Sequence, residues 1–303
     1  MRSLIAVLVL LASTAFAQAP QPNWDQAKQE MMKFTEDLVR IDTSNPPGNE
    51  IKAAEYIKAV LDREGIPVDI FQKKPGRANL VARLKGNGSQ KPILIMGHLD
   101  VVGVERDKWT MDPFASIVKD GFLYGRGSAD DKNIVAGVLE TMLLLHRLKV
   151  PLARDVILVN EAGEESDSDI GMNYLVAEHW NDIAAEYCYT EGPNPPIVNG
   201  KLQYVGVATA EKVPSGGKLV AHGVSGHASI PRLDNPVIHL SAAVAKVGQW
   251  RTQLSLNDTT TAFFAGLAKI SPPADAALYR NLQSADSQQR LLADQPLYYA
   301  MLH

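Results

Sequence analysis

The stretch ILIMGHLD, residues 93–100, places a histidine and an aspartate directly after a short apolar run. The run Ile93–Met96 predicts a buried strand, and the ends of such strands are where α/β sheets form ligand sites. His98 and Asp100 are two residues apart, so in extended backbone their side chains point to the same side. This spacing allows Asp100 to orient one ring nitrogen of His98 while the other binds a metal ion. By itself, a histidine at a strand end is more often structural than metal-binding.

Helices and short apolar strands alternate on both sides of this stretch. Helices are expected at 24–41, 50–63, 134–148 and 171–178, and strands at 68–71, 80–84, 156–159, 187–189 and 203–209. Such alternation is typical of an α/β fold in which helices cover both faces of a largely parallel sheet. After about residue 211 the pattern changes to an expected strand at 218–221 and a helix at 235–250. We therefore expect a domain boundary near residue 211.

The composition excludes several classes of protein. Of the 303 residues 46% are hydrophobic, which argues against a disordered chain. The net charge of −4, from 30 Lys+Arg and 34 Asp+Glu, offers no basic surface for nucleic acid. The single cysteine, Cys188, excludes an intrachain disulfide and cysteine-rich zinc modules. It lies within the strand expected at 187–189, so we expect it to be buried.

The first seventeen residues have the pattern of an export signal. Arg2 precedes an apolar run at 4–12, and Ala15 and Ala17 supply the small residues of a cleavage site. The run is shorter than the roughly 20 apolar residues that span a bilayer. We expect a signal peptide at 1–17, cleavage after Ala17, and a secreted or periplasmic protein without a membrane span.

Three further turns carry carboxylates after apolar or glycine-rich segments. They are the turn GRGSADDK (125–132) with Asp130 and Asp131, the pair Glu164 and Glu165 after 156–159, and Glu191 after 187–189. Taken singly, the aspartates are explained as helix caps and the adjacent glutamates as a solvated surface pair. Taken with His98, one imidazole and several carboxylates suit Zn²⁺, Co²⁺ or Mn²⁺. A carboxylate can also bridge two such ions.

The order and spacing of these motifs resemble the M20 family of metallopeptidases and related amidohydrolases. The matching motifs are IDTSNPPGNE (41–50), GHLDVV (97–102), LYGRGSADDK (123–132), EAGEES (161–166), YTEG (189–192) and GVSGHASIP (223–231). The resemblance implies an α/β zinc-peptidase catalytic domain, residues 18–210. It also implies a smaller inserted α+β lid domain, residues 211–303, that mediates homodimerisation.

The resemblance implies a metal role for five residues. His98 corresponds to the terminal ligand of a first zinc ion, with Asp100 as the acid that orients it. Asp130 corresponds to the bridging carboxylate, which in the family is followed by a cis peptide bond. Glu191 completes the first zinc site, and Glu165 belongs to the second.

The resemblance also implies a catalytic role for two residues. Glu164 corresponds to the general base that activates water for zinc-assisted amide hydrolysis. His227 corresponds to the lid histidine that reaches the partner subunit's site and stabilises the oxyanion; by itself it reads as a turn residue. Dipeptides, peptide C-termini and N-acyl amino acids are all substrates of this scaffold. Export favours a carboxypeptidase or dipeptidase, with an N-acyl amino acid amidohydrolase as the alternative.

One ligand of the family pattern has no match. The second zinc site needs a histidine that follows the lid, but His239 lies in an expected lid helix and His303 is the last residue. We therefore expect a chain that ends within an incomplete lid. Two hypotheses remain open: a fragment of an active exported hydrolase, or a naturally short, inactive protein that binds a metal or a partner. The motif HExxH is absent, and GxSxG is broken at His227.

Overall fold

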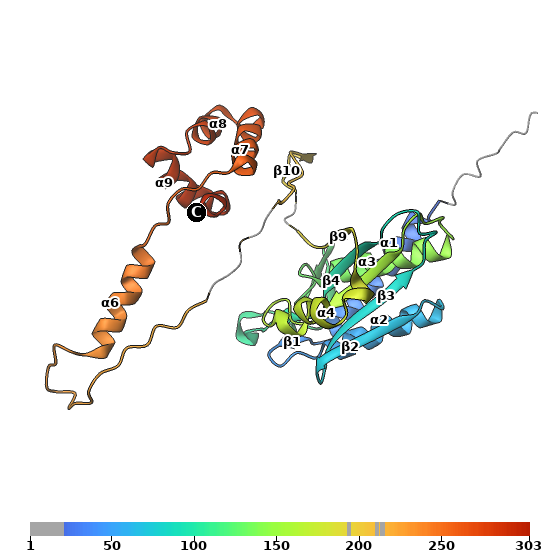
Figure 1. Cartoon of the computed structure of the whole chain (residues 1–303), viewed down its shortest axis with the longest axis horizontal. Helices are drawn as coiled ribbons and strands as arrows, with labels where there is room; N and C mark the ends of the chain where they lie inside the picture. The colour runs from blue at the N-terminus through green and yellow to red at the C-terminus, as the bar shows by residue number, and fades with distance from the viewer. Residues whose placement is uncertain (1–20, 193–194, 210–211, 213–215) are drawn as a thin grey trace, which may run out of the picture. The chain divides into compact units, whose positions relative to one another are not determined.

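The computed structural model describes residues 21–192, 195–209, 212 and 216–303 (Figure 1). The predicted signal peptide, residues 1–17, lies outside these residues. The chain packs as two compact units that divide between Gly192 and Pro193. The domain boundary expected near residue 211 falls inside the second unit and stays a prediction. Within the described part of the chain, no helix combines the length and the apolar character needed to cross a membrane.

The first unit is built on a five-stranded sheet of order β2-β3-β8-β4-β9. The strands are β2 Val68–Lys74, β3 Arg77–Leu84, β4 Ile93–His98, β8 Val156–Glu161 and β9 Tyr187–Tyr189. Strand β4 runs parallel to both β8 and β9, whereas β3 runs antiparallel to both β2 and β8. The expectation of a largely parallel sheet is therefore wrong for half of the pairings. The tight turn between β2 and β3 accounts for the first of these pairs, because it permits only an antiparallel arrangement.

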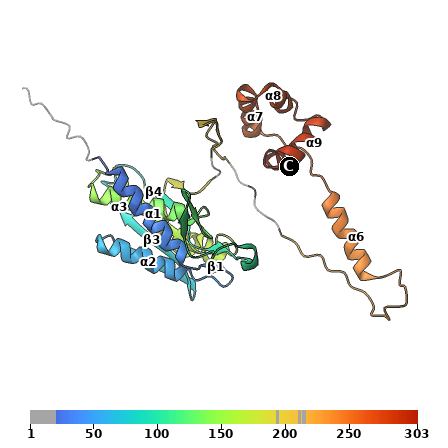
Figure 2. The same cartoon turned by 180° about the vertical axis from the view of Figure 1, so that it is seen from behind.

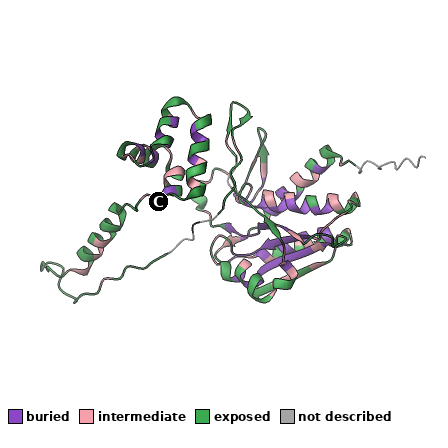
Figure 3. Ribbon diagram, turned by 45° about the horizontal axis from the view of Figure 1, so that its top comes forward, coloured by how far each residue is buried: buried purple, intermediate pink, exposed green. Residues whose placement is uncertain are grey.

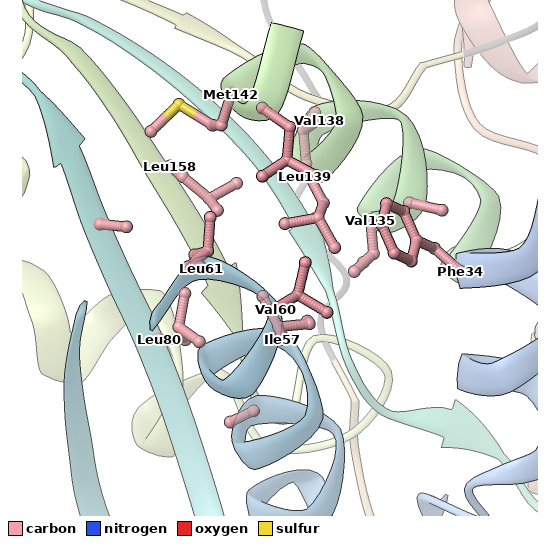
Figure 4. Close-up of a cluster of buried hydrophobic side chains, with 14 of the residues drawn as sticks. Phe34, Ile57, Val60, Leu61, Leu80, Val135, Val138, Leu139, Met142 and Leu158 are labelled. Atoms are coloured by element: carbon pink, nitrogen blue, oxygen red, sulfur yellow. The ribbon is translucent and has the colours of Figure 1, made fainter. Parts of the chain in front are cut away.

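Helices cover both faces of this sheet. One face packs against α1 Trp24–Arg40, α2 Glu50–Arg63 and α3 Lys132–Arg147, which are labelled in Figure 2. The other packs against α4 Met172–Glu178, labelled in Figure 1, and α5 Trp180–Ile183. Successive side chains of β8 alternate between the two faces, as a strand requires. Val156 and Leu158 join the larger core under α1 to α3, and Ile157 and Val159 join the smaller one. Figure 4 shows Leu158 in the larger core, facing side chains of α2 and α3.

A buried lysine ties the first helix to the start of α3. The Lys132 ammonium donates to the carbonyl oxygens of Leu38 at 2.9 Å and Ile41 at 2.6 Å. The Leu38 carbonyl also accepts the backbone N–H of Ile41 at 3.0 Å, so Lys132 is its second donor, and both bonds serve carbonyl groups at the C-terminus of α1. Burial lowers the pKa of Lys132 to about 8. The start of α3 is thereby held in place directly after the turn that carries Asp130.

Short elements complete the first unit. They are β1 Ser44–Asn45, β5 Val101–Val102, β6 Ile117–Lys119, β7 Phe122–Tyr124, and the 3₁₀ helices Arg106–Lys108 and Ser168–Ile170. Strands β6 and β7 form a hairpin that leads into the glycine-rich turn. Strand β1 pairs in parallel with β5, and the hydroxyl of Thr43 donates to the carbonyl of Leu99 at 2.7 Å. This pairing brings the loop after α1 beside the end of β4.

The second unit is mainly helical. Its elements are β10 Ile197–Val198, β11 Lys201–Leu202, α6 Pro236–Gln249, α7 Asp258–Ile270, α8 Pro273–Arg280, α9 Ala285–Asp294 and α10 Pro296–Leu302. Helices α7 to α10 enclose a small core that includes Phe264, Tyr279 and Leu291. Buried residues concentrate in that core and in the first unit, whereas α6 has none (Figure 3).

Most of the predicted elements are confirmed, and three local predictions are wrong. Helix α2 and strand β9 have the predicted limits. Residues 203–209 and 218–221 form no strand in the part of the chain that the structure describes. Among the described residues neither segment pairs with a strand, and an unpaired strand leaves its backbone hydrogen bonds to water. Cys188 is exposed, not buried, because β9 is an edge strand of the sheet.

Candidate metal centre

The candidate site lies at the carboxyl ends of three neighbouring parallel strands. Because β8, β4 and β9 run in the same direction, their carboxyl ends lie together. His98 is the last residue of β4 and lies opposite Glu161 of β8. Glu164 and Glu165 follow β8, and Glu191 follows β9. The sheet topology therefore collects side chains from distant parts of the sequence.

Carboxylates surround the outer ring nitrogen of His98. The Nε2 atom lies 2.9 Å from Asp130 Oδ1, 3.6 Å from Glu191 Oε1 and 4.0 Å from Glu164 Oε2. His98 with Glu164 and Glu191 forms one group whose ligand atoms all lie within 4.8 Å of one another. His98 with Asp130 and Glu165 forms a second such group. The structure thus brings together the four predicted ligands and the predicted general base, which are His98, Asp130, Glu165, Glu191 and Glu164.

The inner ring nitrogen of His98 faces Asp100. Nδ1 lies 3.0 Å from the backbone carbonyl oxygen of Asp100 and 3.6 Å from its carboxylate Oδ1. The nearer acceptor is thus the carbonyl, where the spacing had suggested the carboxylate. With Nδ1 donating to this carbonyl, Nε2 is the ring atom that would bind a cation, once it has given up its own proton. Burial acts to lower the pKa of His98, but the acids around it outweigh burial and raise the pKa to about 10.

The Asp100 carboxylate links three segments of the chain. It is completely buried and accepts hydrogen bonds from the backbone N–H groups of Glu164 at 3.1 Å and Glu165 at 3.3 Å. It also accepts a bond from the side-chain amide of Asn45 at 3.2 Å. Burial acts to raise the pKa of Asp100, but His98 and these donors outweigh it and lower the pKa. Asp100 therefore stays ionised and holds the Glu164–Glu165 turn against the end of β4.

The second aspartate of the glycine-rich turn is a site residue that sequence reasoning missed. Asp131 is completely buried, and its Oδ2 accepts from the backbone N–H of His98 at 3.1 Å. It occupies the N-cap position of α3 but makes no capping bond there, so the helix-cap explanation is wrong. A Cβ on Gly97 would lie 2.7 Å from Asp131 Oδ2, so only glycine admits this approach. The peptide bond between Asp130 and Asp131 is cis, as the resemblance implied.

The turn after β8 explains why two adjacent glutamates can serve one site. Gly163 has φ +73°, and a Cβ there would lie 2.6 Å from the carbonyl oxygen of Asp167. This glycine turns the chain so that both glutamates follow directly beside Asp100. The Glu164 side chain is 45% exposed and lies at the open side of the cluster. Burial and Asp130 raise the pKa of Glu165.

The remaining predicted residue lies in the second unit. His227 is exposed, and its Nδ1 lies 2.8 Å from the hydroxyl of Ser229. This local contact suits a turn residue, and the catalytic role of His227 stays a prediction. His239 is exposed on α6, and His303 contacts Thr252 and Gln288.

The residues at the sheet edge fit a divalent cation. The donor set is one imidazole nitrogen and several carboxylate oxygens, which suits zinc, cobalt or manganese. The buried Oδ1 of Asp131 has no hydrogen-bond partner among the described residues. Negative charge gathered this closely around one histidine is stabilised when a cation binds. His98, Asp130, Glu165 and Glu191 are the residues that would hold it.

Comparison with known proteins gives the same family as the motifs. A model described as Peptidase family M20/M25/M40 matches residues 94–286. Over 145 residues the chain is 35% identical to the N-formyl-4-amino-5-aminomethyl-2-methylpyrimidine deformylase of Halalkalibacterium halodurans. This match covers 46% of this chain and 34% of that protein. Over 236 residues it is 30% identical to a probable succinyl-diaminopimelate desuccinylase of Staphylococcus aureus, covering 77% of this chain and 55% of that protein.

Two solved structures are also similar. The M20 family metallo-carboxypeptidase of Sulfolobus solfataricus has a TM-score of 0.48 and 23% identity, covering 54% of this chain and 37% of that chain. Human carnosine dipeptidase 1 has a TM-score of 0.49 and 21% identity, and the match covers 56% of this chain and 39% of that chain. The matched part of this chain spans only 34% to 55% of the curated relatives' own length.

The family model matches more than half of the chain and includes every residue of the metal cluster. The chain therefore belongs to Peptidase family M20/M25/M40.

Proposed function

We propose that this protein is a metal-dependent hydrolase of amide bonds, with two zinc ions in each complete site. One observation carries the proposal. Two overlapping groups, each with three potential ligands, share His98 at the carboxyl edge of the sheet, with two carboxylates in each group. Cobalt or manganese suits the same donor set. A bound cation of this kind polarises a scissile carbonyl and lowers the pKa of water.

Within this proposal, the chain's own residues divide the work between binding and proton transfer. His98, Asp130, Glu165 and Glu191 bind the cations. Glu164 takes a proton from the attacking water and delivers it to the leaving nitrogen. Its half-exposed side chain supports this role, since the carboxylate must reach both the site and the substrate.

The substrate class divides into two candidates. We propose a carboxypeptidase or dipeptidase, because the N-terminal pattern of the sequence predicts export, and export favours a role in scavenging peptides. A second candidate is an N-acyl amino acid amidohydrolase. The printed names of two relatives, a deformylase and a probable desuccinylase, favour it because both name the removal of an acyl group.

An assay with two substrate panels tests the proposal. The zinc-loaded protein is offered dipeptides and C-terminally blocked and free peptides in one panel, and N-acetyl, N-formyl and N-succinyl amino acids in the other. Glu164→Gln serves as the control, because it keeps the shape of the side chain but cannot accept the proton. Hydrolysis of peptides alone supports the first candidate, and hydrolysis of the acyl series alone supports the second. Zinc binding without turnover of either panel supports the inactive metal-binding protein.

We further propose export and homodimerisation through the second unit. Helix α6 supports the dimer, because it has no buried residue and exposes large apolar side chains. These are Val237, Ile238, Val244 and Val247, and the exposed Trp250 follows directly after the helix. Light scattering after size-exclusion chromatography tests the dimer, and N-terminal sequencing of the exported protein tests cleavage after Ala17. A monomer, or a protein that keeps residues 1–17, contradicts the respective proposal.

A further inference from the structure

Asn45 makes a contact with the metal cluster that none of the metal-ligand assignments includes. Its side-chain amide donates to Asp100 Oδ2 at 3.2 Å and also to the hydroxyl of Ser166. Asn45 lies in the loop after α1, and it is 55 residues from Asp100 and 121 from Ser166 in sequence. One amide therefore bridges the end of β4 and the turn after β8.

The two acceptors of Asn45 belong to the segments that carry the ligands. Asp100 contacts the inner ring nitrogen of His98 and receives the backbone N–H groups of the two glutamates. Ser166 directly follows Glu165. The amide of Asn45 is thus attached to both sides of the cluster, with the imidazole on one side and the glutamate turn on the other.

The backbone around Asn45 makes this attachment rigid. Ser44 and Asn45 pair in parallel with Val101 and Val102, directly after Asp100. The buried hydroxyl of Thr43 donates to the carbonyl of Leu99 at 2.7 Å. The amide nitrogen is consequently held at a set position relative to the end of β4, which a flexible surface side chain would not be.

From this geometry we infer that Asn45 is a positioning residue for the metal centre, held in its orientation by Ser166. The inference rests on the proposed function, since it assumes that the cluster binds a cation. Asn45 restrains the carboxylate of Asp100, and Asp100 in turn sets the distance between His98 and the glutamate turn. Outer partners that orient ligands in this way contribute to metal affinity although they never touch the ion.

Cobalt binding to the full chain tests the inference. The d–d absorption of Co²⁺ reports both the affinity and the geometry of the site. The variants are Asn45→Ala, Ser166→Ala and the double variant. The matched control is Asn87→Ala, because Asn87 is an exposed asparagine whose side chain, among the described residues, accepts from the nearby backbone N–H of Ser89 and makes no contact with the cluster. Melting of each metal-free protein is measured in parallel.

We expect Asn45→Ala to weaken Co²⁺ binding about tenfold and to change the absorption bands. Ser166→Ala should weaken it by a smaller factor, and the double variant should bind no more weakly than Asn45→Ala, because the two residues act in series. The control should bind as the unsubstituted protein does. A residue that only braced the loop would instead lower the melting temperature of the metal-free protein and leave the affinity and spectrum unchanged.

The outcomes separate this inference from the proposed function. If the unsubstituted protein binds Co²⁺ and Asn45→Ala binds it equally well with the same spectrum, only the inference is wrong. If the unsubstituted protein binds no Co²⁺, both the inference and the proposed metal centre are wrong. Should Asn45→Ala not fold, Ser166→Ala decides alone, because Ser166 is exposed in a turn. Unchanged binding by that variant then overturns the inference.

Discussion

The Nε2 atom of His98 lies 2.9 Å from Oδ1 of Asp130, a residue 32 positions later in the sequence. A further hydrogen bond holds the same two segments together. The backbone N–H of His98 donates to the carboxylate of Asp131, the residue after Asp130, and Gly97 leaves room for that carboxylate. The end of β4 and the turn before α3 are thus joined through both main chain and side chains. This junction presents an imidazole and a carboxylate to the same point, and the predictions about metal binding start from it.

Replacement of His98 should abolish tight metal binding. His98 belongs to both candidate ligand groups, so His98→Asn removes a donor from each. Loss of an outer partner of a ligand lowers metal affinity by up to about 100-fold. Because His98 is itself a proposed ligand, we expect its loss to lower the affinity for Zn²⁺ or Co²⁺ by at least about 100-fold. Titration calorimetry measures the change. His239→Asn, on an exposed face of α6, should bind as before. Equal affinity in both variants would contradict the proposed centre.

The two adjacent glutamates should behave differently when each becomes glutamine. Glu165→Gln should lower the metal content, because an amide is a poorer ligand than a carboxylate. Glu164→Gln should keep its metal and lose turnover, typically by a factor of about 10² to 10⁴ for a general base. Elemental analysis of the purified variants, together with the substrate panels, measures both effects. Metal loss in Glu164→Gln with retention in Glu165→Gln would show that the two roles are reversed.

The buried ion pair between Glu50 and Arg77 should be costly to break from one side. Arg77 donates twice to the Glu50 carboxylate, with both bonds at 2.7 Å, and Glu50 is completely buried. Arg77→Met leaves that charge without a partner and should lower the free energy of unfolding by about 3–5 kcal/mol. The double variant Glu50→Leu/Arg77→Met should recover most of this loss. Urea unfolding monitored by circular dichroism measures both variants.

An exposed pair supplies the control for that prediction. Lys58 and Asp62 lie one helical turn apart on α2, and both side chains are well exposed. Lys58→Met should change the free energy of unfolding by less than about 1 kcal/mol. A loss as large as that in Arg77→Met would indicate that the lost charge, and not its burial, causes the effect.

Glu140 should make the stability of the first unit depend on pH. Its side chain is on α3 and is 4% exposed, and neither carboxylate oxygen has a hydrogen-bond partner among the described residues. The nearby cation, Arg147, is already bound to Glu30 and Glu64. Burial raises the pKa of Glu140 from 4.5 to about 7, and those two glutamates add to the rise. The folded protein therefore holds this proton more tightly than the unfolded chain does.

The sign of the effect follows from that difference in proton binding. The contribution of Glu140 to stability is fully present below pH 4.5 and is lost as the pH rises through about 7. Glu140→Met removes the buried acid and should stabilise the protein at pH 8 by about 2 kcal/mol, with little change at pH 4.5. Urea unfolding at the two pH values measures this. Glu55→Met, at an exposed position on α2, should show no such dependence. A gain of equal size at both pH values would contradict the assignment.

Local patterns were sufficient for most of the first unit. The period of apolar residues predicted α2 and β9 with their observed limits, and the motifs contained His98, Asp130 and the glutamates. These signals are local, because the period of a helix or strand and the residues that follow a strand can both be recognised from neighbouring positions in the sequence. Helices α7 to α10 were not predicted, although Asn257 caps α7 and Ser284 caps α9. Those caps were the signals that could have located two of these helices.

The roles of Asp131, Asn45 and Cys188 depended on contacts that no local pattern contains. Asp131 is of a residue type that commonly caps helices, but its carboxylate accepts the buried backbone N–H of His98 at the end of β4 instead. Asn45 reads as a turn residue, and only the pairing of β1 with β5 brings it to Asp100. Cys188 reads as a core residue, and only the strand order places it at an edge. In each case the deciding partner is far away in sequence.

By itself, the sequence determined which elements form around the candidate site, which chemical groups follow each strand, and the family to which the chain belongs. Only the tertiary structure decided that β4 lies between β8 and β9, so that three strand ends meet at one edge, and that Asp100 and Asn45 connect them. The physical reason is the range of the interactions. Helix periods, turns and caps involve neighbours along the chain, whereas strand order and burial involve residues tens of positions apart, whose pairing depends on the packing of the whole sheet.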